Sequence, residues 1–334
     1  MPNRTIWAIT DGKAGMVNQA LGLADAMARV IGACQVVEKL VTPSYPWSLL
    51  PAGFWPRGIR GTTNSGTAWN PPWPDAVVSC GRHAVGPAIW VKRQSGGRTK
   101  LVHAQHPRTA ARHFDVIVAQ SHDRLNGSNV INALGSMHRI TEDRLADALE
   151  RDGERFSAIP RPTVAVLIGG TNKTFRMTPT IAGRLATDLR ALMDETGCGL
   201  LVTASRRTGE ENLALLRDRV TGPGIYFWDE TGENPYSAFL ARADAFLVTG
   251  DSVNMISEAC FTGKPVHIIA LAGGEGSKFE RFHADICAGG YARPFAGRLE
   301  QWEGKKLDET ARVAAEILDR LKLRSAGGGS PQAA

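Results

Sequence analysis

Short apolar runs alternate with longer amphipathic stretches along most of the chain. Runs such as RTIWAIT from Arg4, AVVSC from Ala76 and PTVAVLI from Pro162 have the length and β-branched content of buried strands. Polar loops and stretches of helical periodicity, such as 17–31 and 179–195, separate these runs. This alternation predicts an α/β fold, in which helices cover parallel sheets.

The same order of elements starts again in the second half of the chain. We expect further strands at CQVVEKL, KLVHA, DVIVA, GLLVTAS, GIYFW, AFLVTG and PVHIIAL, and a polar helix over 142–154. Two successive halves of this kind predict two Rossmann-like, doubly wound domains facing a cleft, 1–158 and 159–306. A helix over 307–323, which could pack back on the first domain, precedes a Gly/Ser/Pro-rich tail, 324–334, that we expect to be disordered.

Composition narrows the function classes. A length of 334 residues suits two domains, and the net charge of +6 is spread along the chain, which argues against a dedicated nucleic-acid binder. The basic surplus suits an anionic substrate or weak attraction to an acidic membrane surface. Five widely spaced cysteines form no C-x-x-C pair, and no apolar stretch could span a bilayer. We expect a cytoplasmic protein, and peripheral membrane contact stays open.

One segment departs from the alternation. Residues 43–74 hold seven prolines, together with Phe54 and the four tryptophans Trp47, Trp55, Trp69 and Trp73. A loop of this length is either packed on itself over the sheet edge or functional. The functional alternative is an apolar lip that binds an acceptor or touches lipid, since aromatic side chains favour boundaries between apolar and wet regions.

Ligands of open parallel sheets bind beyond the carboxyl ends of the strands, so the loops there carry the candidate chemistry. In the first half, TDGKAGM follows the opening strand. Gly12 and Gly15 allow close approach of the backbone, while Asp11 and Lys13 would supply a general base and a cation. A plain glycine turn is the alternative, because the loop matches neither G-x-G-x-x-G nor a P-loop.

Two loops of the second half are suited to a diphosphate. The strand PTVAVLI ends in Gly169 and Gly170, followed by the donors Thr171, Asn172 and Lys173. The strand GLLVTA ends in Ser205, Arg206 and Arg207. Adjacent arginines point in different directions, and we expect Arg206 to face the ligand.

The loop TGDSVNMISEA is the most informative. Gly250, Asp251 and Ser252 lie between a strand and a helix, where free amides and the positive helix end favour an anion, although Asp251 or Ser252 could simply cap the helix. Glu258, under two turns into that helix, could accept hydrogen bonds from a ribose diol, and Asn254 lies on roughly the same face.

The remaining polar candidates are weaker. His106 and Asp123 follow strands of the first half and are reserve candidates for the base, and Arg108 is an anion contact of the same loop. Clustered histidines invite a metal site, but no cysteine or suitably spaced carboxylate joins them, so we expect none. Lys278 and Arg281 of KFERFH could close over a ligand, or form the polar face of a helix.

Taken together, DGKAGMVNQALGLA, HAQHPR, GGTNK, TASRRTG, TGDSVNMISEA and KFERFH resemble the "elongated mitochondria" fission-factor family of plants and its bacterial relatives, from Trp7 to about Phe295. More distantly, the chain is similar to MurG-like glycosyltransferases of the glycosyltransferase-B fold. That resemblance implies that Glu258 holds ribose, that Ser252 and Asn254 line the base or diphosphate region, and that Gly170 and Thr171 face the diphosphate. The MurG-like histidine of the first glycine loop is matched here by Met16, so its role does not carry over.

These observations favour a glycosyltransferase that moves a sugar from a nucleoside diphosphate donor, UDP-type preferred, to an unidentified acceptor without metal or cofactor. The first domain would present the acceptor and the second would bind the nucleotide. The family's plant role, which is to recruit a dynamin-related GTPase to mitochondria, favours a non-catalytic adaptor with a protein partner instead. A nucleotide-sugar epimerase or hydrolase on the same fold is the third reading.

Overall fold

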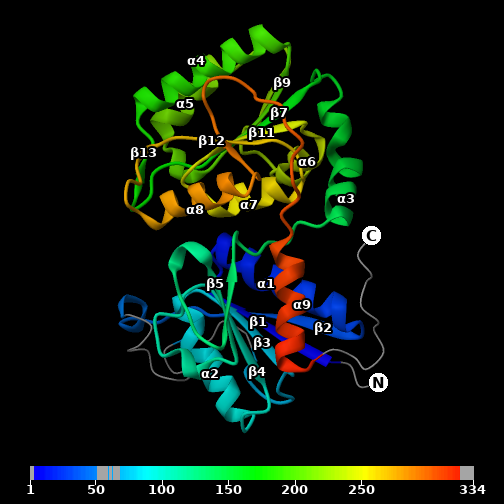
Figure 1. Ribbon diagram of the computed structural model, residues 1–334, viewed down its shortest axis with the longest axis vertical. Coiled ribbons are helices and arrows are strands. Elements are labelled where there is room, and N and C mark those ends of the chain that lie inside the picture. Colours follow the sequence, from blue (N-terminus) through cyan, green and yellow to red (C-terminus); the bar gives the residue numbers. More distant parts are fainter. Residues whose placement is uncertain (1–3, 51–58, 60–61, 63–67, 324–334) are drawn as a thin grey trace. The chain divides into compact units, whose positions relative to one another are not determined.

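The computed structural model describes residues 4–50, 59, 62 and 68–323, which form two compact units (Figure 1). Unit 1 runs to Arg139 and takes up the chain again from Asp308, and unit 2 is Ile140–Leu307. The division therefore falls earlier than residue 158, because the helix α3 (Glu142–Asp152) packs on α6 (Tyr236–Arg242) of unit 2. The tail expected to be disordered lies outside the described residues.

Unit 1 holds a six-stranded parallel sheet in the order β2-β1-β3-β4-β5-β6. Its strands are β1 Arg4–Thr10, β2 Cys34–Leu40, β3 Ala76–Cys80, β4 Lys100–Ala104, β5 Val116–Gln120 and β6 Val130–Ala133. The central runs predicted from the sequence are confirmed as strands, whereas β6 was not predicted. Its four residues, VINA, are too few to show a period.

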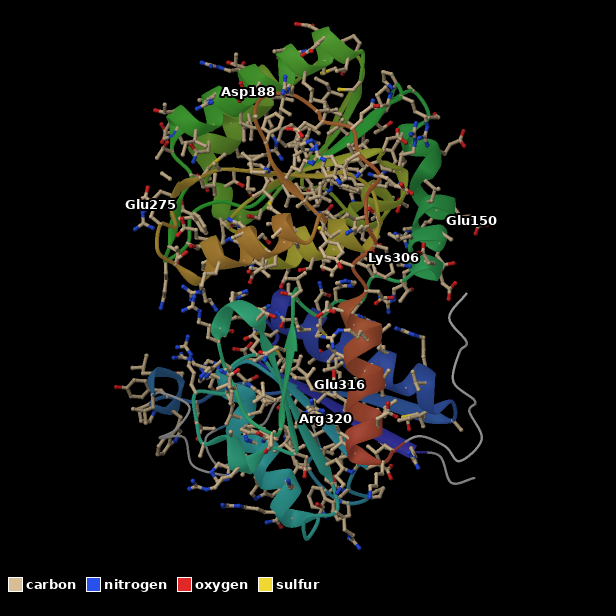
Figure 2. All side chains as sticks on the ribbon, in the orientation of Figure 1. Glu150, Asp188, Glu275, Lys306, Glu316 and Arg320 are labelled. Carbon is tan, nitrogen blue, oxygen red and sulfur yellow. The ribbon has the colours of Figure 1, made fainter. Side chains whose placement is uncertain are left out.

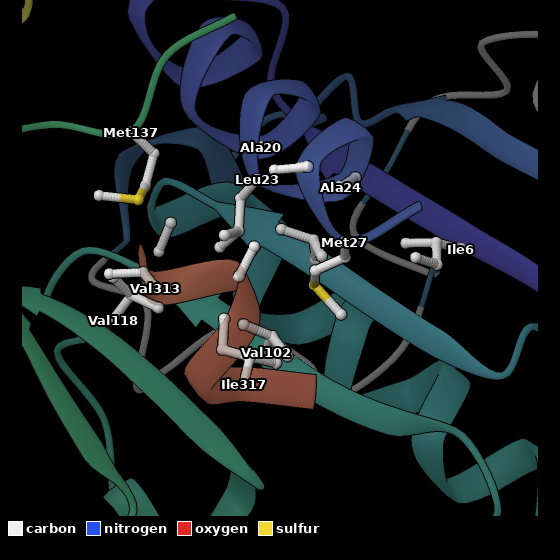
Figure 3. Close-up of a cluster of buried hydrophobic side chains, with 14 of the residues drawn as sticks. Ile6, Ala20, Leu23, Ala24, Met27, Val102, Val118, Met137, Val313 and Ile317 are labelled. Carbon is white, nitrogen blue, oxygen red and sulfur yellow. The ribbon is translucent and has the colours of Figure 1, made fainter. Parts of the chain in front are cut away.

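Alternate side chains of these strands enter two separate cores. Ala8, Val78 and Val102 face the helices α1 (Ala14–Ile31) and α9 (Glu309–Leu321), which pack against each other (Figure 3). Trp7, Val77 and Leu101 face the opposite side, where α2 (Val85–Gln94) covers the sheet. A sheet buried on both faces explains why its strands read as continuous apolar runs.

The aromatic segment is partly a packing element. Trp69 and Trp73 lie edge-on to the ring of Trp7, at centroid distances of 6.3 and 6.0 Å, and join the core on the α2 side of the sheet. Tyr45 and Leu49, by contrast, are 82% and 69% exposed. The alternative in which the loop packs over the sheet therefore applies to the end of the segment. Phe54 and Trp55 lie outside the described residues.

Unit 2 repeats the architecture with a six-stranded parallel sheet in the order β10-β9-β7-β11-β12-β14. Its strands are β7 Thr163–Ile168, β9 Gly199–Ala204, β10 Ile225–Phe227, β11 Ala245–Thr249, β12 Val266–Ile269 and β14 Arg293–Pro294, and a small antiparallel pair joins β8 (Phe175–Arg176) to β13 (Ala272–Gly273). The helices besides α3 and α6 are α4 Pro179–Thr196, α5 Glu210–Arg219, α7 Val253–Phe261 and α8 Lys278–Ala288. The central strands β9, β7 and β11 are neighbours, so the loops at their carboxyl ends meet.

Candidate functional site

In unit 2, the loops after β7, β9 and β11 are tied together around Gly169. Its amide donates to the hydroxyl of Thr249 at 2.6 Å, and its carbonyl accepts from the hydroxyls of Ser205 and Thr208 at 3.1 and 2.6 Å. The predicted residues Gly169, Ser205 and Gly250 are therefore brought to one edge of the sheet. Such a network fixes the loops before any ligand arrives.

Asp251 lies inside this loop cluster, with a side chain that is 0% exposed. Its carboxylate accepts a hydrogen bond from the Thr249 hydroxyl at 2.7 Å and another from Nη2 of Arg207 at 2.6 Å. A Cβ on Gly169 would lie 2.2 Å from Oδ1 of Asp251, so only glycine fits there. The carboxylate of Asp251, a residue that the sequence placed in the ligand loop or at the helix cap, thus holds the three loops together.

The two adjacent arginines have different surroundings. Arg207 donates to the buried Asp251 although its own side chain is 45% exposed, and Arg206 and Lys173 of the preceding loop are exposed as well. The carbonyl of Arg207 accepts a hydrogen bond of 2.8 Å from the amide of Thr171. The same carbonyl lies close to Gly170, whose φ of +151° suits glycine. Arg206 and Lys173, which the sequence singled out for an anion, are thus exposed at this edge, and Arg207 beside them is paired with Asp251.

Asn172 builds its own turn instead of facing outward. Its Oδ1 accepts the amides of Thr174 and Phe175 at 2.7 and 2.9 Å. Short polar side chains commonly stabilise turns in this way. The side-chain oxygen of Asn172 is therefore occupied by the backbone, whereas the sequence offered this residue to a ligand as a donor.

The helix α7 starts at this same edge. Ser252 is its N-cap and accepts the amide of Met255, while Asn254 in the first turn is partly exposed. Glu258 is only 4% exposed, and its Oε2 accepts a hydrogen bond of 2.6 Å from the hydroxyl of Tyr236 at the start of α6. The helix thus combines amide donors at its first turn with a buried carboxylate further along.

A cavity of about 210 Å³ lies beside the loop cluster, within unit 2. Phe175, Ile268 and Leu271 form apolar walls, and Glu280 and His283 of α8 supply polar groups. Nε2 of His283 donates to the carbonyl of Gly250 at 2.8 Å, and burial lowers the pKa of this histidine. The cavity therefore shares Gly250 with the loop cluster and is also lined by Glu275, which is labelled on the loop before α8 in Figure 2.

The two cations predicted on α8 do not line this cavity. Lys278 is exposed, and Nη1 of Arg281 donates to the carbonyl of Ser277 at 3.4 Å within its own helix start. The lining positions on α8 are Glu280, His283 and Cys287, which lie on another face of the helix. One face of KFERFH is thus turned to the cavity, and it carries a carboxylate and an imidazole.

In unit 1, Asp11 follows β1 and lies against the turn after the neighbouring strand β3. Its Oδ2 is 2.9 Å from Nδ1 of His83 and 2.5 Å from Nζ of Lys13, and the side chains of Asp11 and His83 are 4% and 6% exposed. Burial opposes ionisation of Asp11, but the hydrogen bonds of Lys13 and His83 outweigh it and lower the pKa. A carboxylate of lowered pKa is a weaker base than the sequence suggested.

His83 was missed by the sequence analysis. It lies in the 3₁₀ turn Arg82–Ala84 directly after β3, and its Nε2 accepts a hydrogen bond of 2.8 Å from Nε of Arg82. With Nε2 accepting, Nδ1 carries the proton and donates it to Asp11. The available signal was a glycine followed by Arg82 and His83 at a strand end, which is the same signal that singled out the other loops.

The other unit 1 candidates lie at the same edge but apart from this pair. His106 and Arg108 are exposed in the loop after β4, where the amide of Arg108 donates to Nδ1 of His106 at 3.0 Å. Asp123 ends a 3₁₀ turn after β5. Gly12 has a φ of +77°, and Gly15 belongs to the first turn of α1. Lys13 and His83, rather than His106 or Asp123, therefore contact Asp11.

Nowhere in 4–50, 59, 62 and 68–323 do three or more His, Cys, Asp or Glu side chains gather in a group that could hold a metal ion. Among those same residues, no helix has the length and apolar character needed to cross a membrane.

Comparison with known families and proteins gives a consistent result. The family described as "Mitochondrial fission ELM1" matches residues 14–321. "Mitochondrial fission protein ELM1" of Arabidopsis thaliana is 28% identical over 279 residues, which are 75% of this chain and 65% of that protein, so the chain spans slightly less than two thirds of that relative. "Uncharacterized protein RP120" of Rickettsia prowazekii is 25% identical over 95% of this chain and 99% of its own length.

Among solved structures, the UDP-GlcNAc 2-epimerase of Methanocaldococcus jannaschii matches with a TM-score of 0.55 over 94% of this chain and 99% of its own. The sequence identity is 11%, so this likeness concerns the fold. It confirms the predicted glycosyltransferase-B-like fold of two Rossmann-like domains, and the family match confirms the resemblance carried by the motifs.

Proposed function

This chain belongs to the mitochondrial fission ELM1 family, and from that premise we propose that unit 2 binds a nucleoside diphosphate sugar. One observation carries the proposal: three strand-end loops are fixed to one another around Gly169 and Asp251, beside a cavity that shares Gly250. The exposed cations Lys173 and Arg206 and the first turn of α7 supply donors for a diphosphate.

Each part of the donor has a counterpart in unit 2. Glu258 would accept the ribose hydroxyls, with Ser252 and Asn254 nearby at the start of α7. The sugar would enter the cavity, where Glu280 can accept hydroxyls and Phe175 and Leu271 offer apolar walls. The solved epimerase of the same fold acts on UDP-GlcNAc, which favours a UDP-type donor.

The reaction we propose is transfer of the sugar to a hydroxyl acceptor, assisted by fixed cations and amides in place of a metal. For the proton, we propose His83, oriented by Asp11, as the accepting group, since a histidine held by a carboxylate is a better base than a carboxylate of lowered pKa. Arg82 would have to yield Nε2 to the hydroxyl. His106 and Asp123 are the alternative bases.

Thermal unfolding with UDP, GDP, ADP, CMP and their sugar conjugates tests nucleotide binding. A ligand that binds only the folded state raises the Tm, by an amount that depends on concentration over Kd. We expect one base to give a selective shift that Glu258→Ala loses. Glu150→Ala, an exposed glutamate on α3 (Figure 2), should keep that shift. Absence of any shift at millimolar nucleotide would contradict the proposal.

The same set of nucleotides and sugar conjugates can separate nucleotide binding from turnover of the sugar donor. His83→Gln should keep the nucleotide shift but lower the acceptor-dependent release of nucleoside diphosphate from the sugar donor by about 10²–10⁴-fold, the usual contribution of a general base. Arg206→Ala should lower turnover more than affinity. Release at the wild-type rate from His83→Gln would exclude it as the proton acceptor.

Family membership favours a second candidate, a non-catalytic adaptor. The Arabidopsis relative is named as a mitochondrial fission protein, and an adaptor could keep the fold without using the site. A protein partner captured equally well by the wild type and by a Glu258→Ala/Arg206→Ala double variant would support this function. Loss of capture in the double variant would tie the partner to the nucleotide site. Turnover of a free nucleotide sugar without acceptor would instead indicate an epimerase or hydrolase.

A further inference from the structure

The cavity beside the loop cluster of unit 2 has a lining of hydrogen-bond acceptors and apolar groups. Of the described residues that line it, none is a lysine or an arginine. Its charged side chains are the carboxylates of Glu275, on the loop before α8 (Figure 2), and of Glu280 in the first turn of α8. Oε2 of Glu280 accepts the amide of Gly276 at 2.7 Å, which fixes the position of this carboxylate. Two negative charges therefore border the cavity, and its described lining holds no positive charge to offset them.

The imidazole of His283 adds a third acceptor to the lining. Its Nε2 donates to the carbonyl of Gly250 at 2.8 Å, so that nitrogen carries a proton. Burial lowers the pKa of His283, which favours the neutral ring with a single proton. Nδ1 is then an acceptor. The carboxylates and the imidazole of the cavity thus require a ligand that presents donors.

The apolar part of the lining is formed by Phe175, Ile268 and Leu271. Gly274 packs directly on the ring of Phe175, since its φ is +91° and a Cβ there would lie 2.4 Å from Cε1 of that ring. The pairing of β8 with β13 joins Phe175 to Gly273 and holds the two segments together. Apolar walls beside a few acceptors suit a sugar, whose ring carbons are apolar and whose hydroxyls donate.

We propose that this cavity selects the sugar of the donor by charge, so that it accepts neutral sugars and amino sugars and rejects sugar acids. This inference rests on the proposed nucleotide-binding function and deepens it, because it names the class of sugar. A carboxylate on the sugar would lie near Glu275 and Glu280 without a cation in the lining to pair with, and like charges repel. The exposed cations Lys173 and Arg206 would hold the diphosphate outside the cavity.

The test compares UDP-glucose with UDP-glucuronic acid by calorimetry on the full chain. The two ligands differ only at C6 of the sugar, where a carboxylate replaces a hydroxymethyl group. The wild type should bind UDP-glucose about tenfold more tightly, since like charges a few ångströms apart near a protein surface repel by at least this much. UDP-glucosamine, whose sugar carries an ammonium group, should bind at least as tightly as UDP-glucose.

Two variants of Glu275 test the role of its charge. Glu275→Gln keeps the size of the side chain and should reduce the difference between the two ligands to about threefold, because one of the two negative charges is lost. Glu275→Lys should abolish the difference or reverse it. Glu150→Gln is the matched control: Glu150 is an exposed glutamate on α3, on the other side of unit 2 in Figure 2, and its loss should leave the tenfold difference unchanged.

Equal binding of the two ligands by the wild type, or an intact difference in both Glu275 variants, would overturn the inference. In either case, binding of UDP would leave the proposed function standing. No binding of UDP or of any of these conjugates would instead remove the proposed function itself, and this inference with it.

Discussion

At the scale of single residues, the loop cluster of unit 2 depends on side chains that do not touch a ligand. Asp251 joins Thr249 to Arg207, and the absence of a side chain at Gly169 makes room for its carboxylate. A buried carboxylate that loses a partner has a large free-energy cost, so the cluster tolerates little change. The residues that shape the site are thus as restricted as those that would bind.

This restriction predicts the effect of Gly169→Ala. The added Cβ would overlap Oδ1 of Asp251, so we expect the free energy of unfolding in urea to fall by about 1–3 kcal/mol and the nucleotide shift to disappear. Gly183→Ala is the control, because Gly183 lies inside α4 with ordinary van der Waals space and should gain about 0.5–1 kcal/mol. Equal stability of the two variants would show that Gly169 is not close-packed.

His103 gives a second prediction at this scale. Burial, and secondarily His106, lower its pKa to about 3, and its Nδ1 is 2.9 Å from the Ser79 hydroxyl. Because the unfolded chain takes up a proton near pH 6.5 and the folded protein does not, stability is lost as the pH falls below that value. Between pH 7.5 and 5.5 the wild type should lose about 1.4 kcal/mol more than His103→Gln. If urea unfolding showed the same loss of stability between the two pH values for the wild type and for His103→Gln, that result would contradict a neutral His103.

At the scale of elements, the apolar face of each amphipathic segment predicts a helix, but the fold decides which element packs on that face. The last helix, α9, is separated from α1 by most of the chain, and the two pack together on one face of the unit 1 sheet (Figure 3). Its outer face carries Glu316 and Arg320, which are 2.6 Å apart and labelled in Figure 2. The amphipathic pattern over 307–323 predicted the helix, whereas its neighbour follows from the topology.

Removing apolar volume from α9 should therefore destabilise unit 1. Ile317 is 0% exposed in the core shared with α1, so Ile317→Ala should lower the free energy of unfolding by about 2–5 kcal/mol. Leu149→Ala on α3 is the comparison, since Leu149 is 39% exposed and should cost about 1 kcal/mol or less. Similar urea midpoints for the two variants would argue against burial of α9.

At the scale of the whole molecule, the chain forms two units of the same architecture. The division between them does not follow the order of residues along the chain in a simple way. The sequence pattern placed a boundary near residue 158, yet unit 2 already begins at Ile140 because α3 packs on α6. Unit 1 is completed by residues from Asp308 onward. Composition shifts and prolines mark linkers, but only packing decides which unit a short helix joins.

The sequence by itself determined the central strands, most long helices and the loops that carry the candidate chemistry, because periodicity, glycine and capping residues act over a few positions. It could not determine pairs that are distant in sequence. The contacts of His83 with Asp11 and of Tyr236 with Glu258 form because the fold brings together strands and helices that are separate in the sequence. Likewise, the choice of Arg207 as the partner of Asp251 depended on the direction of each side chain, and that is set by tertiary packing.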